Sequence, residues 1–292
     1  MKRIFLVIVI FTFFFSSALY SLYLDFSISY QPFVFSYIFT FLLDSDDSDR
    51  VNMVLHEPGQ FTVYQAALKH RSGFNLGFGV SYDSGYREND NVVGYFSDVL
   101  AWLGFKQFTI KTTFFSQPFI AIFPLSGIAQ EQERIREFTS KRTTVELFWN
   151  PHNRRGKPSE YYFGIYYQNA DFPKIIERGG RYFFTNDRVS FPSYGIVFRV
   201  DTFSHLMDTS ESGIFPWAEA WLYAGVGEWD FSDKVDTIQI GQFPIDYRLN
   251  SIFGALIILG EKRKISAAIG YHSELDWFIL RHGFIMRAGI RL

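Results

Sequence analysis

In several segments of the chain, charged residues stand at positions that alternate with apolar residues. Arg199, Arg287 and Arg291, for example, alternate with aliphatic and aromatic neighbours. Successive side chains of a β-strand point to opposite faces, so such charges share one face with small and polar residues. Ten residues of this kind are candidates for a polar interior: Asp25, Lys111, Glu146, Arg199, Asp201, Glu219, His272, Glu274, Arg287 and Arg291.

Lone charges in a closed interior would be costly, so these residues must be paired or hydrated. They could form a structural salt-bridge network that fills the interior. Alternatively, they form a charged constriction that selects solutes, as rings of charged side chains do in pores. The pattern leaves both roles open.

Aromatic residues on the same face could contact a solute directly. Part of this set depends on the orientation of segment 216–229, because the alternative places Trp217 in an interfacial aromatic girdle. The orientation with Glu219 inside is favoured, since a glutamate facing lipid would cost up to about 2 kcal/mol. The aromatic candidates are Tyr162, Tyr166, Trp217, Trp221 and Tyr223.

Catalytic and metal-binding patterns are weak in this chain. His272 and Ser273 are adjacent, so they point to opposite faces of a strand, and no serine on the face of His272 and Glu274 can be named as a nucleophile. The other histidines lack metal-site spacing, and there is no cysteine. With 28 basic and 30 acidic residues, no basic balance favours nucleic acid. We expect no enzymatic activity, metal, cofactor or nucleic-acid partner.

The elements that would position these residues are strands with a two-residue period. Aromatic residues make up 20% of the chain, yet its mean hydropathy is close to zero, so apolar and polar residues are finely interleaved. A helix would scatter the aromatic residues around its circumference, whereas a strand collects them on one face. The clearest segments are 22–31, 74–83, 107–114, 161–168, 194–201, 265–272 and 283–292; less regular ones are 61–71, 119–125, 142–150, 216–229 and 249–260.

The first residues have the pattern of a secretory signal peptide. Lys2 and Arg3 precede a run of apolar residues that reaches Phe15, and small residues follow at 16–18. We expect a signal peptide over 1–18, with cleavage as late as residue 21 as the weaker alternative. An uncleaved anchor is the rival interpretation, although the run is short for a spanning helix of about 20 residues. The mature part, 19–292, would be a single domain.

The end of the chain alternates up to its carboxylate. Phe284, Met286 and Ile290 share one face of this segment with Ala288 and Leu292. The segment Gly283–Leu292 resembles the C-terminal strand of bacterial outer-membrane β-barrels, which ends in an apolar, usually aromatic, residue. Leucine at the last position departs from the usual phenylalanine. The resemblance implies that this strand is recognised by the barrel-insertion machinery.

Together these patterns predict an all-β fold: a transmembrane, antiparallel, up-and-down β-barrel of about twelve strands, within a range of ten to fourteen. Short turns are expected on the side of the termini at 72–73, 117–118, 151–159 and 261–264, with a longer connection at 205–215. Longer loops fall on the other side. Segment 95–105 is apolar at roughly helical spacing, and it either folds inward as a plug or extends strands above the membrane.

A barrel of about twelve strands lies between filled small barrels and open wide porins. The leading hypothesis is therefore a narrow outer-membrane channel for small solutes or nutrients, surrounded by outer-membrane lipid. The alternatives are a structural or surface-interaction barrel whose loops contact partners, and a transporter that releases a hydrophobic compound through a lateral opening. A soluble periplasmic β-protein is the rival to the barrel itself.

Overall fold

The computed structural model describes residues 22–42, 50–70, 73–88, 91–122, 135–151, 161–177, 182–229, 243–261, 263–276 and 279–292. The predicted signal peptide at 1–18 lies outside these ranges.

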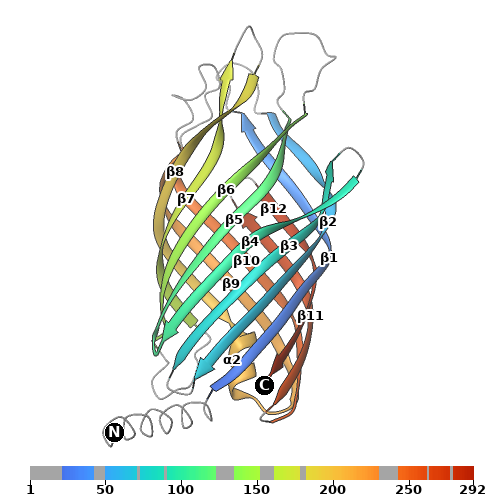
Figure 1. Cartoon of the computed structure of the whole chain (residues 1–292), viewed down its shortest axis with the longest axis vertical. Coiled ribbons are helices and arrows are strands. Elements are labelled where there is room, and N and C mark those ends of the chain that lie inside the picture. Colours follow the sequence, from blue (N-terminus) through green and yellow to red (C-terminus); the bar gives the residue numbers. More distant parts are fainter. Residues whose placement is uncertain are drawn as a thin grey trace, which may run out of the picture.

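Within the described ranges, twelve antiparallel strands form one closed barrel (Figure 1). Each strand pairs with its neighbours in the sequence, and β1 pairs with β12 to close the sheet. The predicted antiparallel twelve-strand barrel is therefore confirmed. The strands are β1 (Leu22–Leu42), β2 (Arg50–His70), β3 (Phe74–Glu88), β4 (Asn91–Phe105), β5 (Phe108–Ile122), β6 (Ile135–Trp149), β7 (Tyr161–Glu177), β8 (Tyr182–Asp201), β9 (Gly213–Trp229), β10 (Phe243–Leu259), β11 (Lys264–Asp276) and β12 (Ile279–Arg291).

The predicted segmentation contains two errors that leave the number of strands unchanged: one strand was overlooked and another was divided in two. Segment 95–105 is neither a plug nor an extension above the membrane, because it belongs to β4, which pairs with both β3 and β5. The turn after β4 is formed by Lys106 and Gln107, and Lys106 has a φ of 54°. Conversely, the predicted turn at 117–118 lies inside β5. There β5 pairs with β6 alone, and such an edge tolerates a proline.

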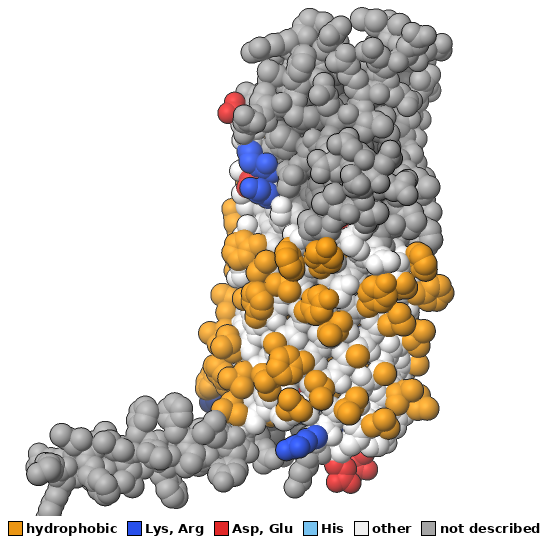
Figure 2. Space-filling model, turned by 45° about the vertical axis from the view of Figure 1, so that its right-hand side comes forward, with side chains coloured by type: hydrophobic (Ala, Val, Ile, Leu, Met, Phe, Trp, Pro, Cys, Tyr) orange, Lys and Arg blue, Asp and Glu red, His pale blue; other side chains and the backbone are white. Residues whose placement is uncertain are grey.

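In the view of Figure 2, apolar side chains are spread over the outer face of the barrel, and we call this surface the apolar belt. Ile196, Phe253 and Phe284 on three different strands are 66%, 63% and 63% exposed. Because the sheet is closed, every strand pairs with a neighbour on each side, although the paired stretches differ in length. A closed sheet with such a belt suits the hydrocarbon of a bilayer.

A short helix, α2 (Thr202–Thr209), follows β8 and lies at the end of the barrel where β1 begins and β12 ends, here called the terminal end (Figure 1). The predicted connection at 205–215 therefore contains helical residues. Asp201 caps α2 by accepting a hydrogen bond of 2.9 Å from the backbone N–H of Ser204. No helix in the described ranges is both long and apolar enough to cross a bilayer.

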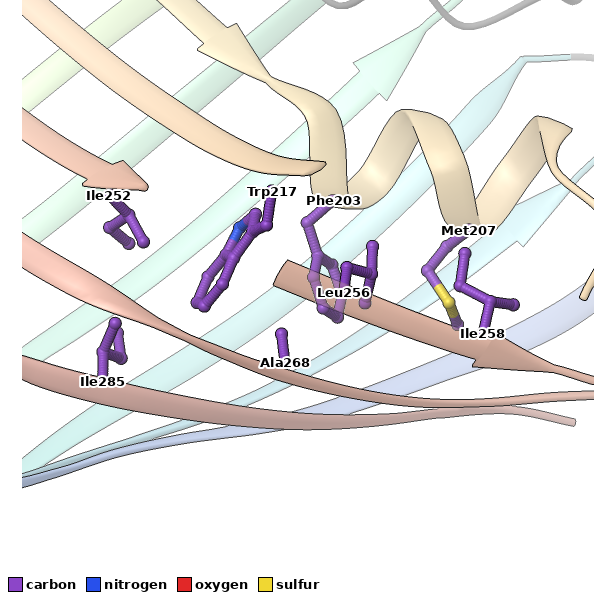
Figure 3. Packing of buried hydrophobic residues seen from close by; sticks show 8 residues of the cluster. All are labelled: Phe203, Met207, Trp217, Ile252, Leu256, Ile258, Ala268 and Ile285. Atoms are coloured by element: carbon purple, nitrogen blue, oxygen red, sulfur yellow. The ribbon is translucent and has the colours of Figure 1, made fainter. Parts of the chain in front are cut away.

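The helix packs against the inner face of the barrel and forms its principal apolar cluster (Figure 3). Phe203 and Met207 from α2 are buried against inward side chains of β9 to β12. On β10, Leu256 and Ile258 are fully buried inside, whereas Phe253 faces outward. Segment 249–260 looked irregular in the sequence because β10 is apolar on both faces.

Candidate functional site in the barrel lumen

A cavity of about 300 Å³, lined by charged, polar and apolar side chains, lies in the lumen. We call it the chamber. Its size falls at the lower end of the range of small-molecule sites. Ten strands contribute inward side chains to it, so it belongs to the closed barrel as a whole rather than to one hairpin. The charged and imidazole side chains on its wall are Asp83, Asp98, Lys111, Arg142, Glu146, Arg248, His272, Glu274, Arg281 and Arg287.

One wall of the chamber is a linked set of polar side chains from β5, β6, β9 and β10. Lys111 Nζ lies 3.0 Å from Glu146 Oε2, and the Tyr223 hydroxyl donates a hydrogen bond to Glu146 Oε1. The Arg248 guanidinium lies over the Tyr223 ring, 4.0 Å from its centroid. The fully buried Glu146 carboxylate is thus satisfied by one cation and one hydroxyl, as a buried charge requires.

Asp246 holds two residues beside this wall by hydrogen bonds. Its Oδ2 accepts hydrogen bonds of 2.8 Å from the Tyr166 hydroxyl and 2.7 Å from the Ser193 hydroxyl. Tyr166 packs edge-to-face on Tyr223 with ring centroids 5.3 Å apart. These contacts fix the aromatic rings on which the Arg248 guanidinium rests.

On the side away from the terminal end, the chamber is narrowed by side chains that meet from different parts of the sheet. Two guanidinium groups contact the Phe115 ring of β5, that of Arg142 at 4.7 Å and that of Arg281 at 5.7 Å from its centroid. Arg281 belongs to β12 and also pairs with Glu274 at 3.6 Å. The lumen is therefore crossed by a mixed aromatic and charged constriction.

Toward the terminal end, the chamber has a floor. The Arg287 guanidinium forms an ion pair with the buried Glu219, which also accepts a hydrogen bond of 2.7 Å from Trp217 Nε1. The same guanidinium lies 4.8 Å from the Phe203 ring and 5.1 Å from the Trp217 ring. An arginine from β12, two residues of β9 and a residue of α2 thereby close this level of the lumen.

A second pair reinforces the floor without lining the chamber. Arg199 pairs with Asp201, the residue that caps α2. The Arg199 guanidinium lies 5.3 Å from the Tyr162 ring and 5.2 Å from the Trp221 ring. The end of β8, the start of α2 and the inner face of β9 are thus joined at one point.

Below the floor, a charge network holds α2 in place. Lys69 Nζ lies 3.0 Å from Asp25 and 3.5 Å from Asp208 of α2. Arg291 forms ion pairs with the same two carboxylates, at 2.6 Å from Asp25. Two cations and two carboxylates from β1, β2, β12 and α2 therefore neutralise one another inside the terminal end.

The carbonyl groups at the end of α2 are satisfied by basic side chains of the barrel wall. Lys264 Nζ donates hydrogen bonds of 2.8 Å to the Met207 carbonyl and 2.6 Å to the Ser210 carbonyl. Arg291 Nη1 donates a further bond of 2.7 Å to the Met207 carbonyl. Cations are favoured at a helix C-terminus, where carbonyl groups lack partners within the helix.

None of the ten charged or histidine candidates is exposed. Lys111, Glu146, His272, Glu274 and Arg287 line the chamber. Arg199, Asp201 and Glu219 belong to the floor, and Asp25 and Arg291 to the charge network beneath it. His272 Nδ1 lies 2.6 Å from the Gln31 amide nitrogen.

The aromatic candidates separate in the same way. Trp221 and Tyr223 line the chamber. Tyr162 packs beside the wall cluster, and Tyr166 and Trp217 are buried in the wall and the floor. Segment 216–229 thus has the orientation that places Glu219 inside.

Several site residues escaped the sequence analysis. Arg248 and Asp246 lay in a segment taken for a loop, and Arg281 lay at the edge of the last predicted strand. Lys69 and Asp208 became relevant only because α2 folds back into the lumen. Within the described ranges, no three His, Asp or Glu side chains are grouped closely enough to hold a metal ion.

No family model matches the chain, and no curated protein matches it. Solved structures that resemble it are bacterial membrane barrels. The β-domain of the Bordetella autotransporter BrkA covers 93% of this chain and 98% of its own, at 10% identity and a TM-score of 0.35. A Pseudomonas aeruginosa FadL homologue covers 93% and 88%, at 8% identity and a TM-score of 0.31.

The translocator domain of the autotransporter NalP from Neisseria meningitidis covers 93% of this chain and 88% of its own, at 10% identity and a TM-score of 0.30. Similarities of this size do not bear on what the chain does. The fold rests on its own strand pairing.

Proposed function

We propose that the chain is an outer-membrane β-barrel, exported by a cleaved signal peptide, that acts as a narrow channel for small polar solutes. The observation that carries this proposal is the chamber, a cavity of about 300 Å³ with charged side chains on its wall, inside a barrel whose outer face is apolar. A barrel with a purely structural role has no need of a space lined by charged side chains at its centre. The mixture of charges on the wall favours small hydrophilic solutes over hydrophobic ones.

Passage through the barrel requires movement of the floor and of α2. The helix has eight residues, and three of them, Phe203, Met207 and the partly buried Leu206, supply its contribution to the apolar cluster. The strands, by contrast, are held by continuous ladders of backbone hydrogen bonds. We therefore expect α2 to be the element that moves, with the barrel wall remaining fixed.

Planar-bilayer conductance of the purified protein tests this proposal. The Phe203→Ser/Met207→Ser variant removes the two buried apolar side chains of α2, so its conductance should exceed that of the wild type several-fold. The Glu211→Gln variant changes an exposed residue of the same connection and should conduct like the wild type. If neither the wild type nor the double variant passes ions or swells liposomes, the channel proposal is refuted.

One observation favours a second function, that of a structural or surface-interaction barrel. Most of the described interior charges pair with one another, as in a lumen that is filled for stability. Its loops would then contact partners. Replacement of residues 44–49 by a Gly-Ser linker that abolishes binding to cells or envelope components, with permeability unchanged, would favour this alternative.

A further inference from the structure

We infer that the chamber binds a small organic carboxylate that also carries a hydroxyl or amine, with Arg248 as its anchor. This inference rests on the proposed function, because it names the class of solute that the chamber would admit. It begins from polar atoms on the chamber wall that have no hydrogen-bond partner within the described part of the chain. These are Arg248 Nε, Arg248 Nη2, Asn250 Oδ1 and Thr113 Oγ1.

The two Arg248 nitrogens lie on the same edge of the guanidinium plane. Both are buried, and neither has a hydrogen-bond partner. A buried donor without a partner costs about 1–3 kcal/mol, and more when the group is charged. Native structures rarely retain such donors unless a ligand, an ion or water satisfies them.

The nearest carboxylates do not satisfy this edge. Asp246 Oδ2 accepts the Tyr166 and Ser193 hydroxyls, and Asp246 Oδ1 lies 4.0 Å from Arg248 Nε, beyond hydrogen-bond distance. Both oxygens of Glu146 are engaged, one by Lys111 and one by Tyr223. The stack on the Tyr223 ring fixes the plane of the Arg248 guanidinium but supplies no hydrogen-bond acceptor to its edge.

Two parallel N–H groups on one guanidinium edge match the two oxygens of a carboxylate. A phosphate can use the same fork. Of the other cations on the chamber wall, Lys111, Arg281 and Arg287 are each already paired with a carboxylate. One guanidinium edge among paired cations therefore balances the single charge of a monocarboxylate better than the double charge of a phosphate dianion.

The second polar group of the solute follows from Asn250. Asn250 lies two residues after Arg248 on β10 and lines the same chamber. Alternate residues of a strand share a face and lie about 6.6 Å apart along it. The unpartnered Asn250 Oδ1 accepts hydrogen bonds only, so it needs a donor on the solute. A hydroxyl or amine a few bonds from the carboxylate meets this requirement, as in a short hydroxy acid or amino acid.

Binding of lactate to the folded full-length barrel in detergent, measured by isothermal titration calorimetry, tests the inference. Lactate should bind saturably, lactamide should not bind, and propanoate, which lacks the hydroxyl, should bind several-fold more weakly than lactate. The Arg248→Lys variant keeps the positive charge but loses the two parallel N–H groups of the guanidinium, so its affinity for lactate should fall at least tenfold. The Asn250→Ala variant should bind lactate and propanoate equally.

Arg199→Lys is the matched control. Arg199 also has a buried Nε without a partner, but it does not line the chamber, so this variant should bind lactate within twofold of the wild type. Heat-modifiable gel migration checks that each variant is folded. If Arg248→Lys does not fold, the comparison of lactate, lactamide and propanoate on the wild type and on Asn250→Ala still decides the matter.

Three results would overturn the inference: no saturable lactate binding, equal binding of lactate and lactamide, or tighter binding of phosphate than of lactate. The outcome is separable from that of the channel proposal. If the barrel binds lactate in detergent but conducts no ions, the binding site is supported and the channel proposal is refuted. If the barrel conducts ions but does not distinguish lactate from lactamide, the channel proposal is supported and the binding site is refuted.

Discussion

At the scale of single residues, the interior is organised around carboxylates that each serve two or more donors. Glu219 accepts from Trp217 and pairs with Arg287, and Glu146 is shared by Lys111 and Tyr223. In a low-dielectric interior, a buried charge that is fully hydrogen-bonded is tolerated, whereas one that loses its partner is costly. The stability of the lumen therefore depends on whether a few buried carboxylates keep their partners, rather than on how many charges the lumen contains.

Glu219 gives a direct test at this scale. The Glu219→Ala variant leaves Arg287 without its counter-ion beside the Phe203 and Trp217 rings, so it should lose about 3 kcal/mol of unfolding free energy. The Glu219→Ala/Arg287→Met double variant removes both charges and should recover most of that loss. Urea unfolding in detergent micelles measures both, with Glu261→Gln at an exposed turn as the control. Equal destabilisation of the single and double variants would contradict this account of the floor.

At the scale of elements, α2 distinguishes this barrel from a simple open cylinder. It is capped at its start by Asp201, satisfied at its end by Lys264 and Arg291, and covered on its apolar side by β9 to β12. The inner faces of these four strands combine apolar side chains that pack on Phe203 and Met207 with basic side chains that bind the end of α2. The inner face of a strand is thus matched to the part of the helix that it contacts.

The absence of cysteine from the chain makes the position of α2 easy to probe. Met207 is 4% exposed, so a Met207→Cys variant should react slowly with a polar maleimide while α2 is docked. Ser212 is exposed in the same connection, and a Ser212→Cys variant should react rapidly. Mass spectrometry of the folded protein in detergent follows both rates. Similar rates at the two positions would show that α2 does not occupy the lumen in solution.

At the scale of the whole molecule, closure depends on the pairing of the first and last strands. Backbone hydrogen bonds join Leu24 and Leu292 in both directions, at 3.0 and 3.2 Å. Inside the barrel, Arg291 pairs with Asp25 across the same seam. Closure removes the two sheet edges, whose unpaired N–H and C=O groups could not be satisfied in lipid.

Heat-modifiable migration tests closure of the barrel. The unheated wild type should run faster than the boiled protein in a gel, because a closed barrel resists detergent unfolding. A variant that lacks residues 283–292 loses most of β12, so it should migrate identically before and after boiling. Leu292→Phe restores the residue type usual at the end of such barrels and should fold at least as well as the wild type. Identical migration of the wild type before and after boiling would argue against a closed barrel.

The sequence by itself determined the two-residue period, the antiparallel closed sheet and the inward position of residues such as Arg287 and Glu219. These follow from local geometry, because successive side chains of a strand point to opposite faces. The strand count was correct although β4 was overlooked and β5 was divided. Those errors arose where Pro118 resembled a turn and where segment 95–105 resembled a helix.

Only the tertiary structure decided which inward residues meet. Arg287 and Glu219 are 68 positions apart, and their contact depends on strand tilt and stagger around the barrel, which no local pattern encodes. The same is true of α2, because a short helix between two strands can lie outside the barrel or fold into it. Its inward position followed from apolar residues on the inner faces of β9 to β12, a signal that became readable only when the face of each residue was known.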